Sequence, residues 1–366
     1  MAESITVVGM DAHKEWIKVA LLLPGETKAV EWQVANERAA VRRMVRKAQR
    51  LGGGEIRFCY EAGPCGYAVK RWIEEWGSVC VVVAPSLIPR KPGDRIKTDR
   101  RDARKLAELY RAGLLTEVHA PTPADEAARN LCRAREDAKA ELLRWRHRVS
   151  KMLLGRGWQW NGTKRAWSRG HRLWLRSLRF EHEADQVVLE DYLLAIEQVE
   201  GRLRVLDEHI EEESQKPAYA EAVGALRCFR GIDTLTAMGL VTELHDFMRF
   251  ETARGLMAFL GLVPSEHSSG DSQRRGGITN AGNRHARRLL IETAWHYRHR
   301  PNVTRLRSRR EGQPARVIAI ADKAMHRLSR RFTRMVERGK PRPKVATAIA
   351  RELAGFVWAA MRTKVA

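Results

Sequence analysis

Four acidic residues in the first third of this 366-residue chain have the type and placement of metal ligands. Asp11 and Glu61 each follow an apolar run that predicts a strand. Asp99 and Asp102 are three residues apart, so both lie on one face of the helix expected to begin there. Carboxylates gathered in this way repel one another unless divalent cations neutralise them. Two Mg²⁺ ions bound by carboxylates activate an oxygen nucleophile and stabilise the leaving oxygen of a phosphodiester, so the set predicts metal-dependent cleavage of nucleic acid.

A single member of this set has simpler interpretations. Asp99 or Asp102 alone is also typical of a helix N-cap, or of an ion pair with Arg100, Arg101 or Arg104. The order of all four residues in one predicted domain favours the metal site. Other chemistries lack their signatures, because the chain has no GxSxG turn and no GxGxxG or GxxxxGK[ST] loop.

The elements that would position these residues follow a definite order. We expect strands at residues 5–9, 16–23, 30–34, 56–60 and 79–83, and helices at residues 37–51, 67–76 and 98–112. The order β-β-β-α-β-α-β-α is that of a ribonuclease-H-like nuclease core. A doubly wound nucleotide-binding fold would instead alternate strand and helix from the start.

The middle of the chain, residues 123–215, predicts long helices, because it is almost free of proline and of strand signals. Residues 133–179 carry 14 basic and 3 acidic side chains, whereas residues 181–213 carry 2 and 12. Two antiparallel helices that pair these faces would account for the division. The basic half also contains Trp158 and Trp160, where glycines interrupt the helix. Indoles among cations suit stacking on unpaired bases, so we predict nucleic-acid contacts for both.

The last segment predicts helices around one Gly- and Ser-rich interruption at residues 265–282. Leu226–Ala237 resembles a helix-hairpin-helix element, in which a turn at Gly231 offers backbone N–H groups to phosphate, although Gly-Ile-Asp also forms an ordinary turn. Residues 274–344 hold 21 basic and 4 acidic side chains, an imbalance that a solvated surface does not need. In this stretch we predict nucleic-acid contacts at Arg274, Arg275, Arg284, Arg287 and Arg288.

The bulk composition agrees with a polyanionic partner. The formal net charge is +23, from 67 Lys and Arg against 44 Asp and Glu, and each neutralised phosphate releases counterions and adds affinity. A basic ribosomal or membrane-surface protein would share this charge. Five cysteines without metal-ligand spacing indicate a reducing compartment, and the N-terminus lacks a signal-peptide pattern. No apolar run approaches the roughly 20 residues that span a bilayer, so we expect a soluble cytoplasmic protein without membrane contact.

Ser269 is a fifth candidate for chemistry. A Ser-Gly pair in a polar loop is usually just a turn. The adjacent Ser268 is equally placed in the sequence. Gly270 favours Ser269, because a residue without a side chain lets a phosphate backbone approach closely.

The motifs resemble those of the DEDD transposases of the insertion sequence one-hundred-and-ten family, which are also described as bridge-RNA-guided recombinases. The N-terminal likeness lies in Gly-Met-Asp-Ala-His-Lys at residues 9–14, Tyr-Glu-Ala-Gly at 60–63 and Lys-Thr-Asp-Arg-Arg-Asp-Ala at 97–103. The C-terminal likeness lies in Phe-Leu-Gly-Leu-Val-Pro at 259–264, Ser-Gly at 269–270, Gly-Gly-Ile-Thr at 276–279, Gly-Asn at 282–283 and Arg-Arg-Leu at 287–289. The likeness covers nearly the whole chain in the expected order. It departs at Asp271-Ser272, where a Gly-Lys type of pair is common, and at Asn280-Ala281, where basic residues are common.

This resemblance implies a RuvC-like domain in which Asp11, Glu61, Asp99 and Asp102 bind Mg²⁺, with Mn²⁺ as an alternative ion. It implies that Ser269 attacks the scissile phosphate and forms a covalent serine–DNA intermediate. It also implies homodimers or homotetramers that act on donor and target DNA, with a site shared between the metal domain of one chain and the serine domain of another. A structured non-coding bridge RNA would pair with both DNAs, so that base pairing reads the sequence.

The predicted fold class is α/β plus all-α, in three parts. Residues 1–122 form a RuvC-like metal-binding domain, residues 123–222 a helical, coiled-coil-like region for oligomerisation and nucleic-acid binding, and residues 223–366 a mostly helical C-terminal transposase domain.

Two alternative functions remain. A RuvC-like junction resolvase would hydrolyse DNA with water and never use Ser269, and a non-catalytic nucleic-acid-binding protein would keep the carboxylates for structure. A covalent protein–DNA adduct would distinguish the serine recombinase from the resolvase. Metal-dependent cleavage would exclude the non-catalytic binding protein.

Overall fold

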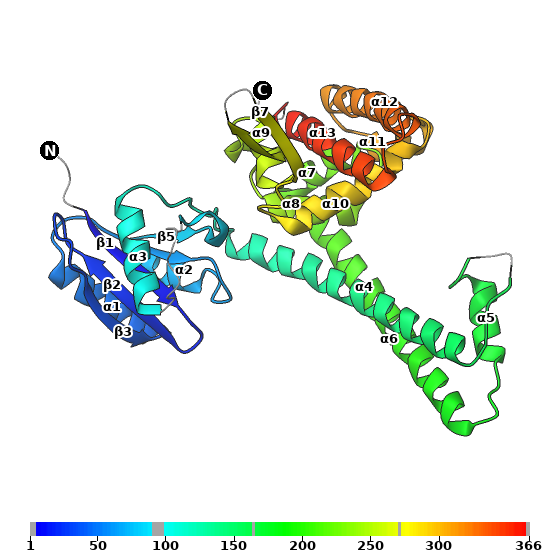
Figure 1. Ribbon diagram of the computed structural model, residues 1–366, viewed down its shortest axis with the longest axis horizontal. Helices are drawn as coiled ribbons and strands as arrows, with labels where there is room; N and C mark the ends of the chain where they lie inside the picture. The colour runs from blue at the N-terminus through cyan, green and yellow to red at the C-terminus, as the bar shows by residue number, and fades with distance from the viewer. Residues whose placement is uncertain (1–4, 90–98, 163–164, 270–271, 364–366) are drawn as a thin grey trace. The chain divides into compact units, whose positions relative to one another are not determined.

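The computed structural model describes residues 5–89, 99–162, 165–269 and 272–363, with the side chains of residues 99–100 and 267–275 outside that description. The chain forms two compact units, Met1–Pro121 and Thr122–Ala366. In Figure 1 the first unit is coloured blue to cyan, and the second is coloured from cyan-green to red. Each unit has its own hydrophobic core. No helix of the described chain is long and apolar enough to cross a membrane.

A five-stranded mixed sheet forms the centre of the Met1–Pro121 unit. Its strands are β1 (Thr6–Ala12), β2 (Trp16–Leu22), β3 (Val30–Ala35), β4 (Ile56–Glu61) and β5 (Val79–Val83), in the spatial order β3-β2-β1-β4-β5. The antiparallel pairs are β1–β2 and β2–β3, and the parallel pairs are β1–β4 and β4–β5. The helices are α1 (Arg38–Leu51), α2 (Ala68–Glu75) and α3 (Asp99–Arg111), with a 3-10 turn η1 (Pro85–Leu87). This topology confirms the predicted ribonuclease-H-like, RuvC-like fold.

The helices divide between the two faces of this sheet. Val8 and Met10 of β1 pack with Met44 of α1 in a core that α2 also joins. Val7 belongs to the other face, where it packs against Ala107 of α3. Successive side chains of a strand point to opposite faces, and α3 therefore covers the face opposite α1 and α2 (Figure 1).

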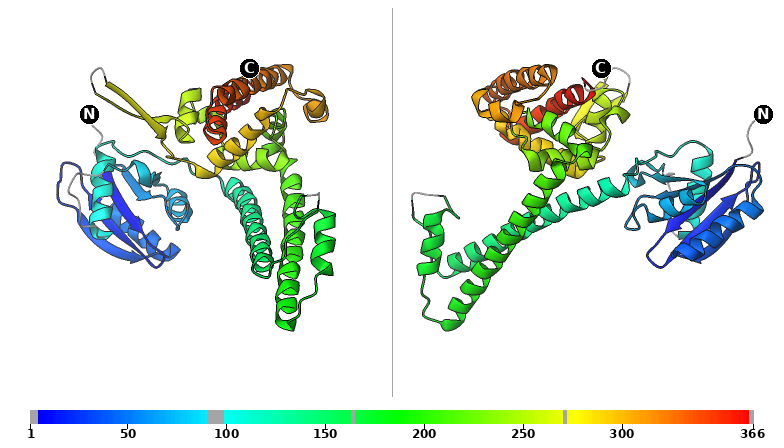
Figure 2. Two further views of the ribbon diagram at one scale, coloured as in Figure 1. Left: turned by 45° about the vertical axis from the view of Figure 1, so that its right-hand side comes forward. Right: turned by 180° about the vertical axis from the view of Figure 1, so that it is seen from behind.

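Two long helices form an antiparallel pair in the Thr122–Ala366 unit (Figure 2). They are α4 (Pro123–Gly155) and α6 (Glu183–Ser214), and α5 (Arg169–Ser177) lies between them in the sequence. Their oppositely charged faces form the ion pairs Arg135–Asp207 at 2.7 Å, Arg146–Glu200 at 2.9 Å and Arg202–Glu141 at 3.0 Å. The basic residues of α4 thus pair with acidic residues of α6. This confirms the prediction that two antiparallel helices pair the oppositely charged halves of this segment.

The other elements of this unit form a helical body. They are α7 (Pro217–Arg227), α8 (Thr234–Leu244), α9 (Ala253–Phe259), β6 (Pro264–Ser269), β7 (Ser272–Ile278), α10 (Arg284–Ala294), α11 (Arg307–Arg310), α12 (Ala315–Glu337) and α13 (Arg342–Arg362), with 3-10 turns η2 (Phe247–Arg249), η3 (Trp295–Arg298) and η4 (Thr304–Leu306). Leu240 of α8 and Leu353 of α13 are fully buried in the core of this body. The turn between α7 and α8 contains Gly231 at φ +82°, so two helices joined by a glycine turn span the segment that resembles a helix-hairpin-helix element in the sequence.

The β6–β7 hairpin occupies a segment for which the sequence indicated no strand. The two strands pair antiparallel, from Pro264 opposite Ile278 to Ser269 opposite Ser272. A backbone hydrogen bond from Thr279 N to the Val263 oxygen, at 2.9 Å, continues the pairing at the base. Between Pro264 and Ile278 at its base, the residues of both strands are polar or glycine, so the hairpin has no hydrophobic alternation by which a sequence can reveal it.

Candidate active site

Asp11 and Glu61 occupy neighbouring positions on the two central strands of the sheet. Met10 of β1 lies opposite Tyr60 of the parallel strand β4. Asp11 and Glu61 are the next residues of these strands, so the same register brings them side by side. Met10 and Tyr60 both point into the core beneath α1 and α2. Because side chains alternate along a strand, Asp11 and Glu61 lie on the opposite face, which α3 covers.

Helix α3 rests directly on β1 at Gly9. A Cβ atom at this position would lie 2.1 Å from the carbonyl oxygen of Ala103, so only glycine permits this approach. Two residues earlier, Val7 packs against Ala107, which is one turn further along the helix. The helix therefore runs antiparallel to the strand, and its first turn lies toward the Asp11 end of β1.

Asp99 and Asp102 belong to this first turn. Asp102 is half-buried, whereas Glu61 is exposed. Neither side chain forms a hydrogen bond or ion pair with another residue in the described chain. The side chain of Asp99 lies outside the described residues. Among the residues that are described, no group of three His, Cys, Asp or Glu side chains is close enough to hold a metal ion, so the backbone brings the predicted positions to one edge of the sheet without a complete ligand set.

The donors at this edge nevertheless suit a hard divalent cation. Asp11, Glu61 and Asp102 all offer carboxylate oxygens, the ligands that Mg²⁺ prefers. In the described part of the chain, no arginine or lysine neutralises Glu61 or Asp102. The carboxylates of these residues fit a site for a divalent cation.

Asp11 has a close neighbour that sequence reasoning missed. The Nε2 atom of His13 lies 3.1 Å from Oδ2 of Asp11. The ring centroids of His13 and Trp16 are 4.1 Å apart. The backbone carbonyl of His13 accepts a hydrogen bond from Asn36 Nδ2 at 2.7 Å. The available signal was the spacing of two residues, which puts Asp11 and His13 on one side of an extended chain. His13 is therefore a further candidate group at this edge.

Ser269 lies at the turn end of the β6–β7 hairpin. It is the last residue of β6 and pairs with Ser272, the first residue of β7. Ser268 is the preceding residue of the same strand, and Arg274 and Arg275 belong to β7. The side chains of all of these residues lie outside the described set. The backbone alone therefore brings both serines beside the turn.

Two glycines join the base of the hairpin to the helices on either side. Gly261 and Gly282 have φ values of +63° and +75°, a region that favours glycine. A Cβ on Gly261 would lie 2.2 Å from the Ala281 oxygen, and one on Gly282 would lie 2.0 Å from the Phe259 oxygen. The Asn283 backbone N–H also donates to that Phe259 oxygen at 3.0 Å. The end of α9 and the start of α10 are thus in direct backbone contact and enclose the hairpin base.

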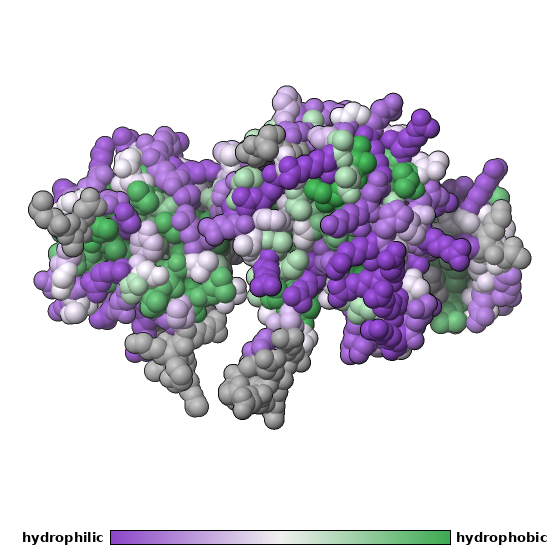
Figure 3. Space-filling view, turned by 90° about the horizontal axis from the view of Figure 1, so that it is seen from above, coloured by the Kyte–Doolittle hydropathy of each residue, from purple (hydrophilic) through white to green (hydrophobic). Residues whose placement is uncertain are grey.

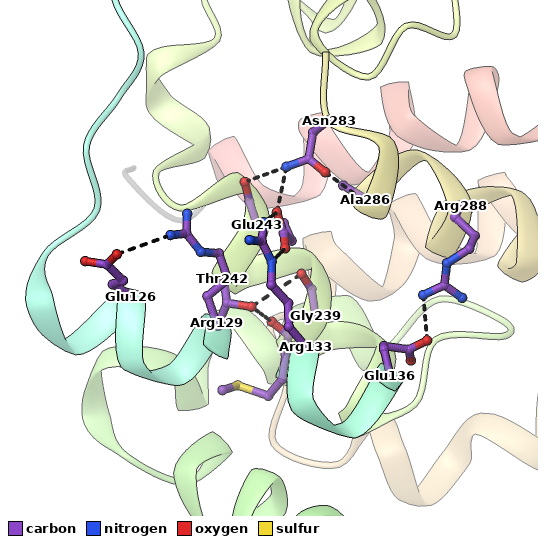
Figure 4. Close-up of polar contacts among 11 residues, drawn as sticks. Glu126, Arg129, Arg133, Glu136, Gly239, Thr242, Glu243, Asn283, Ala286 and Arg288 are labelled. Atoms are coloured by element: carbon purple, nitrogen blue, oxygen red, sulfur yellow. Dashed lines mark hydrogen bonds and ion pairs between the residues drawn. The ribbon is translucent and has the colours of Figure 1, made fainter. Parts of the chain in front are cut away.

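A buried carboxylate connects this region to α4. Glu243 of α8 accepts hydrogen bonds from Arg133 of α4 at 2.8 and 3.1 Å, and from Asn283 Nδ2 at 2.7 Å (Figure 4). Burial acts to raise the pKa of Glu243, but these bonds outweigh burial and hold it below its ordinary value. Asn283 also caps α10, because its Oδ1 accepts from the Ala286 N–H at 2.9 Å. Sequence reasoning missed this network, whose members are distant along the chain.

The arginines predicted at the start of α10 have different surroundings. Arg287 is buried and donates to two backbone carbonyls, at 2.8 and 3.1 Å. Arg288 forms ion pairs with Glu136 of α4 at 2.7 Å and with Glu292 at 2.8 Å. Arg284 is exposed and has no ion pair within the described chain. Of these three guanidinium groups, that of Arg284 is the one most accessible to a ligand.

The two predicted tryptophans also differ. The side chain of Trp158 is 39% exposed and meets the ring of Phe180 edge-on, at 6.3 Å between centroids. Trp160 instead packs against His171 and Trp174, at 5.4 Å from each. Trp158 therefore presents the more accessible indole, whereas Trp160 is part of an aromatic cluster.

Comparison with known proteins assigns both parts of this chain to one family. A DEDD-type IS110 transposase model matches residues 8–156, and a model described as the transposase IS116/IS110/IS902 family matches residues 224–309. The putative transposase y4qE of Sinorhizobium fredii is 42% identical over 97% of this chain and 88% of its own length. The transposase of insertion sequence element IS1533 from Leptospira borgpetersenii is 36% identical over 91% of this chain and 97% of its own length. Asp11, Glu61, Asp99 and Asp102, which we call the carboxylate edge, and the β6–β7 hairpin with Ser269, which we call the serine hairpin, each lie inside a matched region. With two such relatives matching nearly end to end, the chain belongs to the IS110 family of transposases.

Proposed function

We propose that this transposase is a metal-dependent DNA recombinase that cuts and rejoins DNA through a covalent bond to Ser269. The observation that carries the metal-dependent part is the packing of α3 on Gly9, because it directs the first turn of α3 toward Asp11 and Glu61. The carboxylates of Glu61 and Asp102, which have no cationic partner in the described chain, support the same interpretation.

In this proposal Asp11, Glu61, Asp99 and Asp102 hold Mg²⁺ or Mn²⁺. When bound, the ion neutralises negative charge that develops on the oxygens of the reacting phosphate. The chain itself supplies rigidity, because the contact at Gly9 keeps the strand and helix at a fixed separation. The Nε2 atom of His13 lies 3.1 Å from Oδ2 of Asp11, so His13 orients that carboxylate.

Ser269 supplies the nucleophile. Its Oγ forms an ester bond to the scissile phosphorus as the bond from phosphorus to a DNA oxygen breaks. The serine loses its hydroxyl proton, and the departing DNA oxygen gains one. A DNA hydroxyl of the second duplex then attacks the same phosphorus and releases the serine. In this second step the attacking hydroxyl loses its proton and the serine oxygen regains one. The phosphate stays a diester at every stage, whereas hydrolysis would leave a monoester.

The proposed partners are donor DNA, target DNA and a structured non-coding bridge RNA. Base pairing between this RNA and the two DNAs would read the sequence, and the protein would recognise backbone and shape. The net charge of +17 in residues 223–366, from 28 basic and 11 acidic side chains, supports binding to polyanions. The exposed Trp158 and Arg284 support contacts with bases and phosphate. We propose homodimers or homotetramers, in which the metal-binding domain of one subunit and the serine of another act on one phosphate.

The decisive experiment traps the covalent intermediate. A DNA substrate nicked near the junction prevents rejoining, and the DNA-linked peptide is then identified by protease digestion and mass spectrometry. We expect the adduct on Ser269 and its loss in Ser269→Ala, which should still bind RNA and DNA. Ser268→Ala is the matched control and should keep the adduct. An adduct on Ser268 would overturn the residue assignment, and full cleavage without an adduct would indicate a hydrolytic resolvase instead.

Purification of the protein from its host tests the RNA partner separately. We expect one structured RNA to remain bound, with segments complementary to the donor and target DNA. Recombination by RNA-free protein would contradict the guide, without affecting the assignment of the serine.

A further inference from the structure

Three adjoining hollows on the Thr122–Ala366 unit are lined mainly by cationic side chains. The first lies beside Gly231 and the second runs from there onto α12, and the two share Arg300. The third continues along α12 and shares Arg330 and Arg334 with the second. We call the joined hollows the basic groove. Its principal lining residues are Arg230, Arg300, Arg305, Arg330, Arg334 and Arg338.

Few acidic groups neutralise the basic groove. Glu337 is the one carboxylate among the residues that line the three hollows. Arg327 and Arg331, which also line the groove, both form ion pairs with Glu352 of α13. Arg330 and Arg334 are exposed and form no ion pair in the described chain. Their like charges repel, so the groove carries an unbalanced positive potential that a polyanion would relieve.

The wall of the groove beside Gly231 is fixed by hydrogen bonds. Arg230 Nη1 donates to the carbonyl oxygens of His299 and Arg300 at 3.1 and 2.7 Å. The turn at Gly231 packs so closely on the ring of His296 that a Cβ would lie 2.8 Å from it. The chain at residues 296–300 is therefore locked to the α7–α8 turn, and the groove is built into the fold before any ligand binds.

The chemistry of the lining favours a phosphate backbone over unpaired bases. Guanidinium groups match phosphate geometry. Unpaired bases stack on aromatic rings. No Trp, Tyr or Phe lines these hollows, and their aromatic rings are the imidazoles of His296, His299 and His326, which the Lys and Arg side chains of the lining outnumber. From Lys323 to Arg338 the helix rises about 22 Å, the length of six or seven phosphate steps of one strand at about 3.4 Å each.

We propose that the basic groove binds the sugar–phosphate backbone of a nucleic-acid duplex without reading its bases. This inference deepens the proposed function, because a recombinase of that kind must hold duplexes in place during strand exchange. DNA and RNA duplexes share the chemistry that the groove recognises. The surface is distinct from the serine hairpin and from the carboxylate edge, so each can be tested without the other. Hydrophilic side chains cover much of the molecular surface seen in Figure 3.

The test measures binding of the full-length protein to three probes: a 20-base-pair DNA duplex of arbitrary sequence, an RNA hairpin with the same paired sequence, and single-stranded oligothymidine. The variant Arg300→Gln/Arg330→Gln/Arg334→Gln removes three exposed charges, and Arg351→Gln removes one exposed charge on α13 that lines none of the three hollows. We expect the triple variant to bind duplex on the order of tenfold more weakly, with the salt slope of log K shallower by about 2 to 3. Arg351→Gln and oligothymidine binding should change little.

The identity of the duplex follows from the first two probes. If the triple variant binds only the DNA duplex more weakly, the groove is assigned to DNA. If it binds only the RNA hairpin more weakly, the groove is assigned to RNA. Weaker binding of both probes supports recognition of the backbone that they share. An unchanged melting temperature checks the fold. As a second readout, duplex should protect Arg300, Arg330 and Arg334, but not Arg351, from modification by phenylglyoxal.

Unchanged duplex affinity and no protection would overturn the groove assignment, as would an effect confined to oligothymidine. These outcomes leave the proposed serine chemistry standing, because adduct formation is measured independently. Conversely, loss of the serine adduct in a protein whose groove binds duplex would overturn the proposed function alone.

Discussion

Arg133 and Glu243 form a two-point ion pair between α4 and α8. The Nε and Nη2 atoms of Arg133 donate to the two carboxylate oxygens at 2.8 and 3.1 Å, across 110 residues of sequence. The Glu243 side chain is 2% exposed and that of Arg133 is 49% exposed. A half-exposed cation thus stabilises a buried charge. The same carboxylate accepts a hydrogen bond from Asn283, the N-cap residue of α10, which follows the serine hairpin in the sequence.

Removal of Arg133 should destabilise the fold. In Arg133→Met the Glu243 carboxylate stays buried without its main donor, and we expect the free energy of unfolding to fall by about 2 kcal/mol. Adding Glu243→Gln should recover part of this loss, because the amide is neutral. Denaturant unfolding of the two single variants, the double variant and the native chain measures the coupling. Strictly additive effects would show that the pair contributes no interaction energy.

Glu243 also predicts sensitivity to acid. Its pKa is lower in the folded chain than its ordinary value. Such a group stabilises the fold above the unfolded pKa, about 4.3 for glutamate, and this contribution is lost as the pH falls through the folded pKa. The unfolding free energy should therefore decline less between pH 5 and pH 3 in Glu243→Gln than in the native chain. Parallel pH profiles for the two proteins would contradict this role.

Gly9 is the position at which α3 approaches the sheet. Gly9→Ala places a Cβ 2.1 Å from a backbone oxygen, so the helix must move. We expect a loss of about 1–3 kcal/mol in unfolding free energy from overpacking, together with reduced strand exchange because Asp102 moves with the helix. Gly53→Ala is the matched control, since a Cβ there meets nothing within 4 Å. Native stability and activity in Gly9→Ala would contradict the tight contact.

The carboxylate edge predicts loss of activity without loss of fold. Asp11→Asn, Glu61→Gln, Asp99→Asn and Asp102→Asn each remove one negative charge and keep the shape, so strand exchange should be abolished while the melting temperature changes little. Strand exchange in added Mg²⁺ or Mn²⁺ measures the first effect and thermal unfolding the second. Glu108→Gln on the same helix is the control, because that residue forms a surface ion pair with Arg104. Retained exchange in two or more of the four variants would refute the metal site.

The two tryptophans should respond differently to substitution. Trp158→Ala removes an exposed ring, so we expect RNA affinity to fall by about 5- to 100-fold, as for the loss of one stacked base, with an unchanged melting temperature. Trp158→Phe should retain part of the affinity. Trp160→Ala should lower the melting temperature, because Trp160 packs against His171 and Trp174. Equal RNA affinity in Trp158→Ala and the native chain would exclude base stacking at this site.

Much of the first unit could be read from local patterns. The strands begin or end within three residues of the predicted bounds, and the three helices do so within one, because apolar periodicity and glycine stops are local properties. Pairing of α4 with α6 was likewise visible in their opposite charges. The positions of Asp11 and Glu61 near the ends of β1 and β4 could be predicted because the end of a strand is a local feature of the sequence.

Tertiary structure decided what depends on distant neighbours. Arg284 and Arg287 look alike in the sequence, yet one is exposed and the other is buried among backbone carbonyls. The ion pair of Arg133 with Glu243 and the continuity of the basic groove join segments far apart along the chain. Residue type and local periodicity determine which elements form and how much charge they carry. Whether a charged group faces solvent, another charge or a carbonyl is set by close packing of elements whose contacts no local pattern records.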